Sequence, residues 1–169
     1  MEKRIKVRHP YDPEMNICFG CGRNNPVGLK LDFEESETHL HASWKPDVYY
    51  QGYANVLHGG IAATLLDEIG AWCIYVKAGT AAVTQTMTTR YLSPVFMNKG
   101  TITLDAAIIS TDGKNARLFC RLFDGSGKQC IEAEIDYFLY SEEVARKRYN
   151  YPGHDAFYFK DENGEIGHE

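Results

Sequence analysis

The stretch from Val56 to Ala78 places the strongest constraint on this chain, because it is mainly apolar over about six helical turns. Its ionisable residues are His58, Asp67, Glu68 and Lys77. Apolar residues recur in it at steps of three and four positions, namely Ala62, Leu65, Leu66, Ile69, Trp72, Cys73 and Val76. This spacing predicts a long helix that is largely enclosed by the rest of the protein, with its end at Lys77-Ala-Gly79.

Asp67 lies in the middle of this apolar pattern. A buried carboxylate is costly unless it is paired, hydrogen-bonded or used in chemistry. One interpretation is structural, with Asp67 accepting hydrogen bonds from a neighbouring strand. The other is catalytic, because the residues at helical neighbour positions are small and would let another molecule or chain approach: Ala63, Thr64, Gly70 and Ala71.

The start of the predicted helix carries Gly59 and Gly60 directly after His58. Glycines leave the first unpaired backbone N–H groups open to an anion or a developing oxyanion. Asp67 follows His58 by nine residues, which places it about 13.5 Å along the axis and roughly on the opposite face. One helix cannot bring both ends to one reacting atom, whereas two antiparallel copies can. A catalytic site here therefore predicts a homodimer, or a dimer of dimers.

Composition excludes several function classes. The chain has 169 residues and a net charge of −5, which fits one domain whose scattered Lys and Arg residues do not form the basic face of a nucleic-acid binder. We find no apolar run of the ~18 residues that a membrane span needs and no signal peptide, so we expect a cytoplasmic protein without a membrane partner. Five cysteines are an odd number, which favours reduced thiols over a disulfide framework.

The rest of the chain is predicted to form mainly strands. Alternating patterns predict a hairpin of two strands before the helix, over 28–33 and 38–44, and four strands in meander after it, over 82–92, 101–111, 115–123 and 128–140. Together they predict an α+β fold in which an antiparallel six-stranded sheet wraps round one long central helix. Residues 1–26 are expected to be irregular. Residues 141–169 are expected to form a short amphipathic helix over 141–149 and an extended tail along a surface or a partner chain.

Cys18-Phe-Gly-Cys21 has the spacing of half a zinc site. A complete site needs two more ligands, and the sequence has no second pair of this kind. His9 is the one nearby candidate upstream. We therefore favour packed thiols over a metal site, and a redox pair is less favoured still because no helical pattern follows the motif.

Several motifs in a fixed order resemble one enzyme family. They are Cys18-Phe-Gly-Cys-Gly, Asn25-Pro-Val-Gly28-Leu-Lys-Leu31, Leu57-His-Gly-Gly60 with Asp67, and Arg90-Tyr-Leu-Ser-Pro94. Over residues 18–140 the chain resembles the hotdog-fold acyl-CoA thioesterases of the phenylacetyl-CoA thioesterase-like branch. The resemblance implies a hotdog thioesterase domain over 27–140, dimers or tetramers, and an active site between subunits.

The resemblance also implies a role for individual residues. Asp67 matches the catalytic general base or nucleophile. Gly59, with Gly60 beside it, matches the backbone donor to the thioester carbonyl, and His58 matches the histidine that shapes this turn. Thr84 matches the hydroxyl that positions the attacking water. The substrate-binding candidates are Gln51 or Asn55 as the amide upstream of the histidine, Thr86 as an alternative to Thr84, Glu68 as a reserve acid, and Arg90 for a phosphate of coenzyme A.

The expected reaction is hydrolysis of an acyl-CoA thioester to a free acid and coenzyme A, for which no metal or other cofactor is needed. Two alternatives share the fold. One is a non-catalytic module that binds or senses acyl-CoA. The other is an enoyl-CoA hydratase, which is less favoured because His58 lies at the wrong end of the helix to pair with Asp67.

Overall fold

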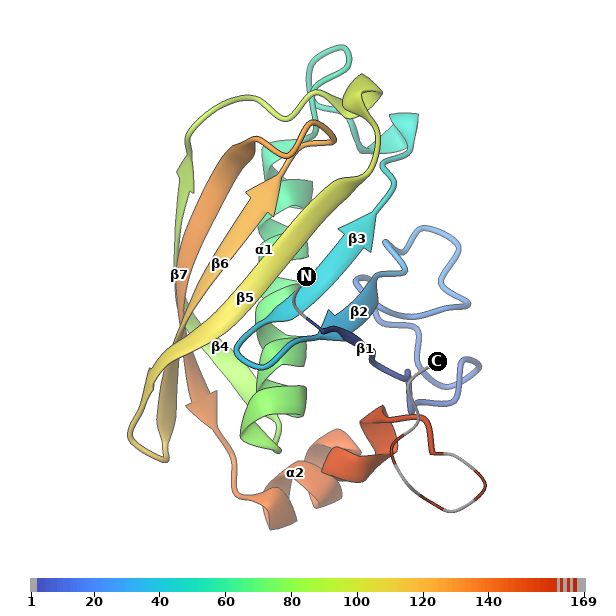
Figure 1. Cartoon of the computed structure of the whole chain (residues 1–169), viewed down its shortest axis with the longest axis vertical. Coiled ribbons are helices and arrows are strands. Elements are labelled where there is room, and N and C mark those ends of the chain that lie inside the picture. Colours follow the sequence, from blue (N-terminus) through green and yellow to red (C-terminus); the bar gives the residue numbers. More distant parts are fainter. Residues whose placement is uncertain (1–2, 161, 163, 165, 167–169) are drawn as a thin grey trace.

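The computed structural model describes residues 3–160, 162, 164 and 166. One antiparallel sheet of seven strands curves round the long helix α1, as Figure 1 shows. Its strand order is β1-β2-β3-β5-β6-β7-β4. The strands are β1 (Ile5–Lys6), β2 (Asp32–Glu35), β3 (Leu40–Trp44), β4 (Ala82–Tyr91), β5 (Ile102–Thr111), β6 (Asn115–Phe123) and β7 (Gln129–Leu139). The predicted α+β arrangement is confirmed.

Helix α1 (Gly59–Cys73) forms because its apolar residues face the concave side of the sheet. Its buried residues are Ala62, Leu65, Leu66, Ile69, Gly70, Trp72 and Cys73. The helix continues as a π-helical segment, Ile74–Ala78. It ends where predicted, because Gly79 adopts a left-handed φ of 67° that glycine tolerates without strain.

The continuous helix Gly59–Ala78 has 20 residues and a mean hydropathy of 1.2, so by length and composition it could cross a membrane. The prediction that no apolar run reaches this length does not hold. Half of the stretch is buried inside the protein, and the core helix of a folded domain meets the same criterion.

The sheet differs from the prediction in two respects. A seventh strand, β1, is present because Ile5 and Lys6 pair with Glu35 and Glu34 of β2, so residues 1–26 are not irregular throughout. The four later strands also do not form a simple meander. Strands β5, β6 and β7 do, but β4 pairs with β7 and forms the far edge of the sheet. The long connection from β4 to β5 lets β4 lie there, and no local turn signal reports it.

The first hairpin is also shorter than predicted. The expected strand over 28–33 begins only at Asp32, because Lys30 has a left-handed φ of 57° that interrupts the extended backbone. The second strand lies where predicted. The indole of Trp44 at its end donates a hydrogen bond of 2.9 Å to the carbonyl of Leu29, which fixes the irregular segment against the sheet.

The C-terminal part folds back onto the domain. Helix α2 (Glu142–Tyr149) is capped by Ser141 and forms as predicted. The expected surface tail is instead partly core, because Tyr151 and Phe157 are buried and stack near Tyr75. The Tyr151 hydroxyl donates to the carbonyl of Tyr75 at 3.1 Å, so aromatic packing joins this segment to the end of the central helix. The predicted domain boundaries at 26 and 140 remain predictions.

Candidate active site

The carboxylate of Asp67 is held at the edge of the sheet by two side chains. Thr84 of β4 donates a hydrogen bond of 2.7 Å from Oγ1 to Oδ1 of Asp67. The Tyr137 hydroxyl of β7 donates to the main-chain carbonyl of Asp67 at 3.0 Å and lies 3.4 Å from Oδ1. Asp67 is half-buried and Thr84 is exposed. The acid is therefore positioned by the sheet while remaining open on the side of β4.

A β-bulge separates the two threonines that the sequence could not tell apart. The register shifts between Thr84, opposite Tyr137, and Thr86, opposite Asp136. Residues two apart on a regular strand share one face, but the bulge inserts one residue, so the two hydroxyls lie on opposite faces. Thr86 donates to Asp136 at 2.8 Å on the outer face. Of the two threonines, only Thr84 contacts the Asp67 carboxylate.

Tyr137 is a positioning residue that the sequence did not reveal. It is fully buried on β7, and burial is the main cause that raises the pKa of its hydroxyl well above the usual range. A Cβ on Gly70 would overlap this hydroxyl. The small residue at 70 was expected to admit a second molecule or chain, but the structure shows that it admits Tyr137 instead.

The other end of helix α1 leaves the N–H of Gly59 open. His58 caps the helix, and its Nδ1 accepts a hydrogen bond of 3.0 Å from the N–H of Gly60. This contact corrects the prediction for Gly60, whose N–H is already engaged. The Gly59 N–H has no hydrogen-bond partner among the residues that the structure describes. The Tyr91 hydroxyl donates to the Gly59 carbonyl at 2.8 Å and so fixes the first turn against β4.

An open groove of about 740 Å³ surrounds this helix start. Its lining includes His58, Gly59 and Ala62 of the helix start and Leu92 to Val95 with Ile131. Tyr53, which is 85% exposed, lines its entrance from the loop before the helix. The groove is mostly apolar with a backbone N–H at its wall, a combination that suits an acyl chain next to a carbonyl oxygen.

Asp67 does not line this groove, because eight helical steps separate it from Gly59. The separation is about 12 Å along the axis. One chain therefore cannot bring this carboxylate and the Gly59 N–H to the same reacting atom. The site shared between two copies stays a prediction.

Comparison with known proteins shows which family and fold this arrangement is similar to. Residues 54–131 match the family model described as the thioesterase superfamily. They contain the helix start, Asp67 and Thr84, and the match ends at Ile131 in β7. The chain has the thioesterase hotdog fold. The match agrees with the resemblance read from the sequence motifs. No curated protein matches the sequence.

Solved structures agree with the fold. A crystal structure of a thioesterase superfamily protein aligns with a TM-score of 0.63 and 24% identity, over 76% of this chain and 60% of that protein. The chain therefore spans less than two thirds of the length of that protein. The PaaI protein from the phenylacetic acid degradation operon of E. coli aligns with a TM-score of 0.61 and 18% identity, over 68% and 82%. A hypothetical thioesterase with coenzyme A from Streptococcus pneumoniae aligns with a TM-score of 0.58 and 18% identity, over 63% and 81%.

Three other predicted residues of the hotdog site are engaged elsewhere. The side-chain oxygen of Gln51 accepts from the Asn55 N–H at 3.1 Å, and Oδ1 of Asn55 accepts from the Asn98 N–H at 2.9 Å. These bonds hold the loop before the helix, where Asn55 has a left-handed φ of 62°. Arg90 pairs with Glu132 at 3.4 Å and does not line the groove. Gln51 and Asn55 therefore hold the loop that leads into the helix, and Arg90 lies in an exposed ion pair.

Glu68, the reserve acid, points away from the hotdog site. Its Oε1 accepts a hydrogen bond of 3.0 Å from Nε1 of Trp72. Burial raises the pKa of its carboxyl to about 7. It lies against the N-terminal segment near Cys18. It therefore does not replace Asp67.

The bulge provides a matched pair of substitutions. We expect Thr84→Ala to lower the turnover of a thioester substrate by about tenfold or more, because a hydrogen bond to a charged group is worth roughly 1.5–3 kcal/mol. Thr86→Ala removes the same atoms two residues away on the outer face and should leave turnover near the wild-type value. Thr84→Ser should restore most of the loss. Equal effects of the two alanine variants in a steady-state assay would contradict a specific role for Thr84.

Proposed function

We propose that the protein is an acyl-CoA thioesterase that acts as a homodimer or a dimer of dimers. The proposal is carried by one observation: each chain holds an ordered, accessible carboxylate and, about 12 Å away along α1, a free N–H at an apolar groove. Neither the carboxylate nor the N–H forms a complete site alone. Membership of the central segment in the thioesterase superfamily supports the reaction class.

The edge strand β4 supports the proposed pairing. It has ten residues, most of them exposed, and its outer edge has no neighbouring strand in the described part of the chain. Val83, Tyr91 and Leu92 on or beside it are 38%, 54% and 53% exposed. A long exposed edge is normally protected or paired. Antiparallel pairing of two β4 strands would continue the sheet and bring the α1 helices of both copies together in opposite directions.

In the proposed reaction the thioester carbonyl lies against the Gly59 N–H of one copy and the Asp67 carboxylate of the other. Asp67 either removes a proton from water, whose oxygen attacks the carbonyl carbon, or attacks that carbon itself. The N–H stabilises the negative charge on the carbonyl oxygen in the tetrahedral intermediate. The C–S bond then breaks, and coenzyme A leaves as a thiolate that takes up a proton. The coenzyme A bound by the Streptococcus pneumoniae relative supports this substrate class.

A panel of acyl-CoA substrates tests the proposal, with free thiol followed by its reaction with a chromogenic disulfide. We expect thiol release from at least one aryl- or alkyl-CoA, and a mass in solution of two or four chains. Tight binding of acyl-CoA without thiol release would instead indicate a binding module. Loss of the conjugated absorbance of an enoyl-CoA without thiol release would indicate a hydratase. A strictly monomeric protein would contradict the shared site.

A further inference from the structure

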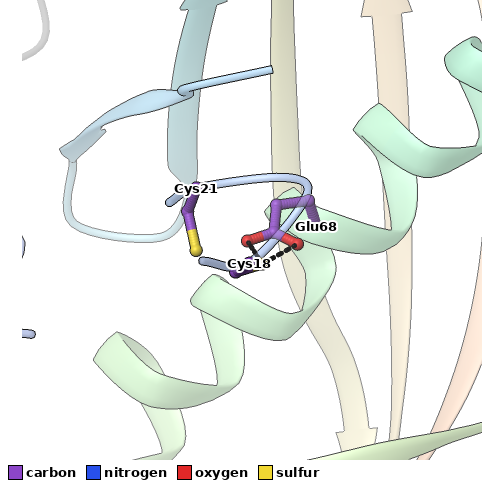
Figure 2. A group of neighbouring side chains, drawn as sticks. All are labelled: Cys18, Cys21 and Glu68. Carbon is purple, nitrogen blue, oxygen red and sulfur yellow. Dashed lines mark hydrogen bonds between the residues drawn. The ribbon is translucent and has the colours of Figure 1, made fainter. Parts of the chain in front are cut away.

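We propose that Cys18, Cys21 and Glu68 bind a zinc ion that fastens the N-terminal segment to helix α1. One donor atom from each of these residues lies within 4.8 Å of the other two. Figure 2 shows the loop with the two cysteines lying across the helix, with both thiols and the carboxylate converging on one space. All five cysteines of the chain are free, so the two thiols are available as ligands.

The distances fit a tetrahedral zinc site. Sγ of Cys18 lies 3.7 and 3.8 Å from the two carboxylate oxygens of Glu68. Two ligands of a tetrahedral zinc ion, one sulfur at about 2.3 Å and one oxygen at about 2.1 Å, are separated by about 3.6 Å. Thiolate and carboxylate ligands in this combination select zinc over magnesium or calcium, which bind oxygen ligands alone.

The loop is shaped for this approach. A Cβ on Gly20 would overlap the Glu68 carboxylate, so only glycine lets the acid reach the two thiols. Gly22 donates a hydrogen bond of 2.9 Å from its N–H to the Cys18 carbonyl, which closes the turn. Two further backbone bonds hold the loop to the chain beyond it, from Leu29 N–H to the Phe19 carbonyl at 2.7 Å and from Leu31 N–H to the Gly20 carbonyl at 3.1 Å.

The surroundings supply room for a fourth ligand and no competing positive charge. The pocket beside the cluster has a volume of about 240 Å³, and neither lysine nor arginine is among its lining residues. A water molecule in this pocket could serve as the fourth zinc ligand. A divalent cation would also neutralise the two thiolates and the carboxylate.

Trp72 orients the Glu68 carboxylate in the proposed site. Its indole N–H donates to Oε1 of Glu68 at 3.0 Å, the kind of outer contact that orients a metal-binding carboxylate. Asp67 precedes Glu68 on α1, and its carboxylate bonds to β4 instead. The zinc site is therefore separate from the proposed hydrolytic centre, and its expected role is structural. The inference does not rest on the proposed function.

Cobalt substitution tests the site directly. The full-length protein is reduced, stripped of metal and titrated with Co²⁺ alone. We expect a thiolate-to-cobalt charge-transfer band in the near ultraviolet that saturates at about one ion per chain and disappears when Zn²⁺ is added. Cys18→Ser and Cys21→Ser should lower zinc affinity by at least about 100-fold, more than the loss of an outer contact costs. Glu68→Gln should weaken binding but keep the band, because both thiolates remain.

Two matched variants control for general damage. Cys130→Ser changes a buried thiol that donates only to the Lys128 carbonyl, and Glu143→Gln changes an exposed acid on α2. Both should bind zinc like the wild type, and circular dichroism should show that every variant is folded. The proposal is overturned if the reduced wild-type protein gives no cobalt band, or if Cys18→Ser binds as tightly as the wild type. It is also overturned if the protein as isolated contains a Cys18–Cys21 disulfide, seen as a mass two hydrogens lower, and no zinc.

Discussion

Asp67→Asn is expected to lower kcat for acyl-CoA hydrolysis by at least about 100-fold, because it removes the base or nucleophile. The substitution is nearly isosteric, and the amide oxygen of Asn can still accept the hydrogen bond from Thr84, which is 2.7 Å long in the wild type. Fold and substrate binding should therefore persist. Free thiol release under saturating acyl-CoA gives kcat, and thermal unfolding reports the fold.

Asp136→Asn provides the matched control on the other face of the same sheet. Asp136 accepts hydrogen bonds from Arg117 at 2.7 and 3.1 Å, and these bonds with Arg117 lower the pKa of its carboxyl. Its exposed ion pair contributes little to stability. Turnover should stay close to wild type. If Asp67→Asn retains full turnover while binding substrate normally, the proposed mechanism is excluded.

Gly59→Pro is expected to reduce kcat by about 10²–10³-fold, the usual cost of removing one oxyanion donor. Proline deletes the N–H and is tolerated at the first helical position, where that group has no acceptor within the helix. His58 already has the extended backbone that precedes proline, with φ −62° and ψ 131°. Gly59→Ala is the control: its Cβ would lie 3.5 Å from the Tyr91 ring, an ordinary contact, and the N–H is kept.

Mixing the two inactive variants tests whether each site uses two chains. When Asp67→Asn and Gly59→Pro subunits are dissociated together and reassociated, half of the dimers contain one of each, and one of their two sites is intact. We expect recovery of about a quarter of wild-type turnover for a two-fold dimer. If both halves of a site came from one chain, no mixture would recover activity, although each variant would still be inactive alone.

The fold was largely predictable because its signals are local. The spacing of apolar residues set the central helix and its end at Gly79, and alternation set the four later strands to within two residues. The backbone conformation of Lys30 and the burial of Tyr151 were not predicted. The left-handed backbone at Lys30 and the burial of Tyr151 depend on contacts with residues distant in sequence, which periodicity does not report.

The candidate site was also predictable from the sequence only in part. The sequence by itself determined that a carboxylate at Asp67 and an open helix start at Gly59 lie on one helix, about 12 Å apart, because helical rise depends on residue number alone. Only the tertiary structure decided that Thr84 and not Thr86 contacts that acid, that Tyr137 occupies the space beside Gly70, and that Glu68 joins two cysteines 50 and 47 residues upstream. Bulges, strand order and loop docking place these groups, and they arise from packing over long sequence separations.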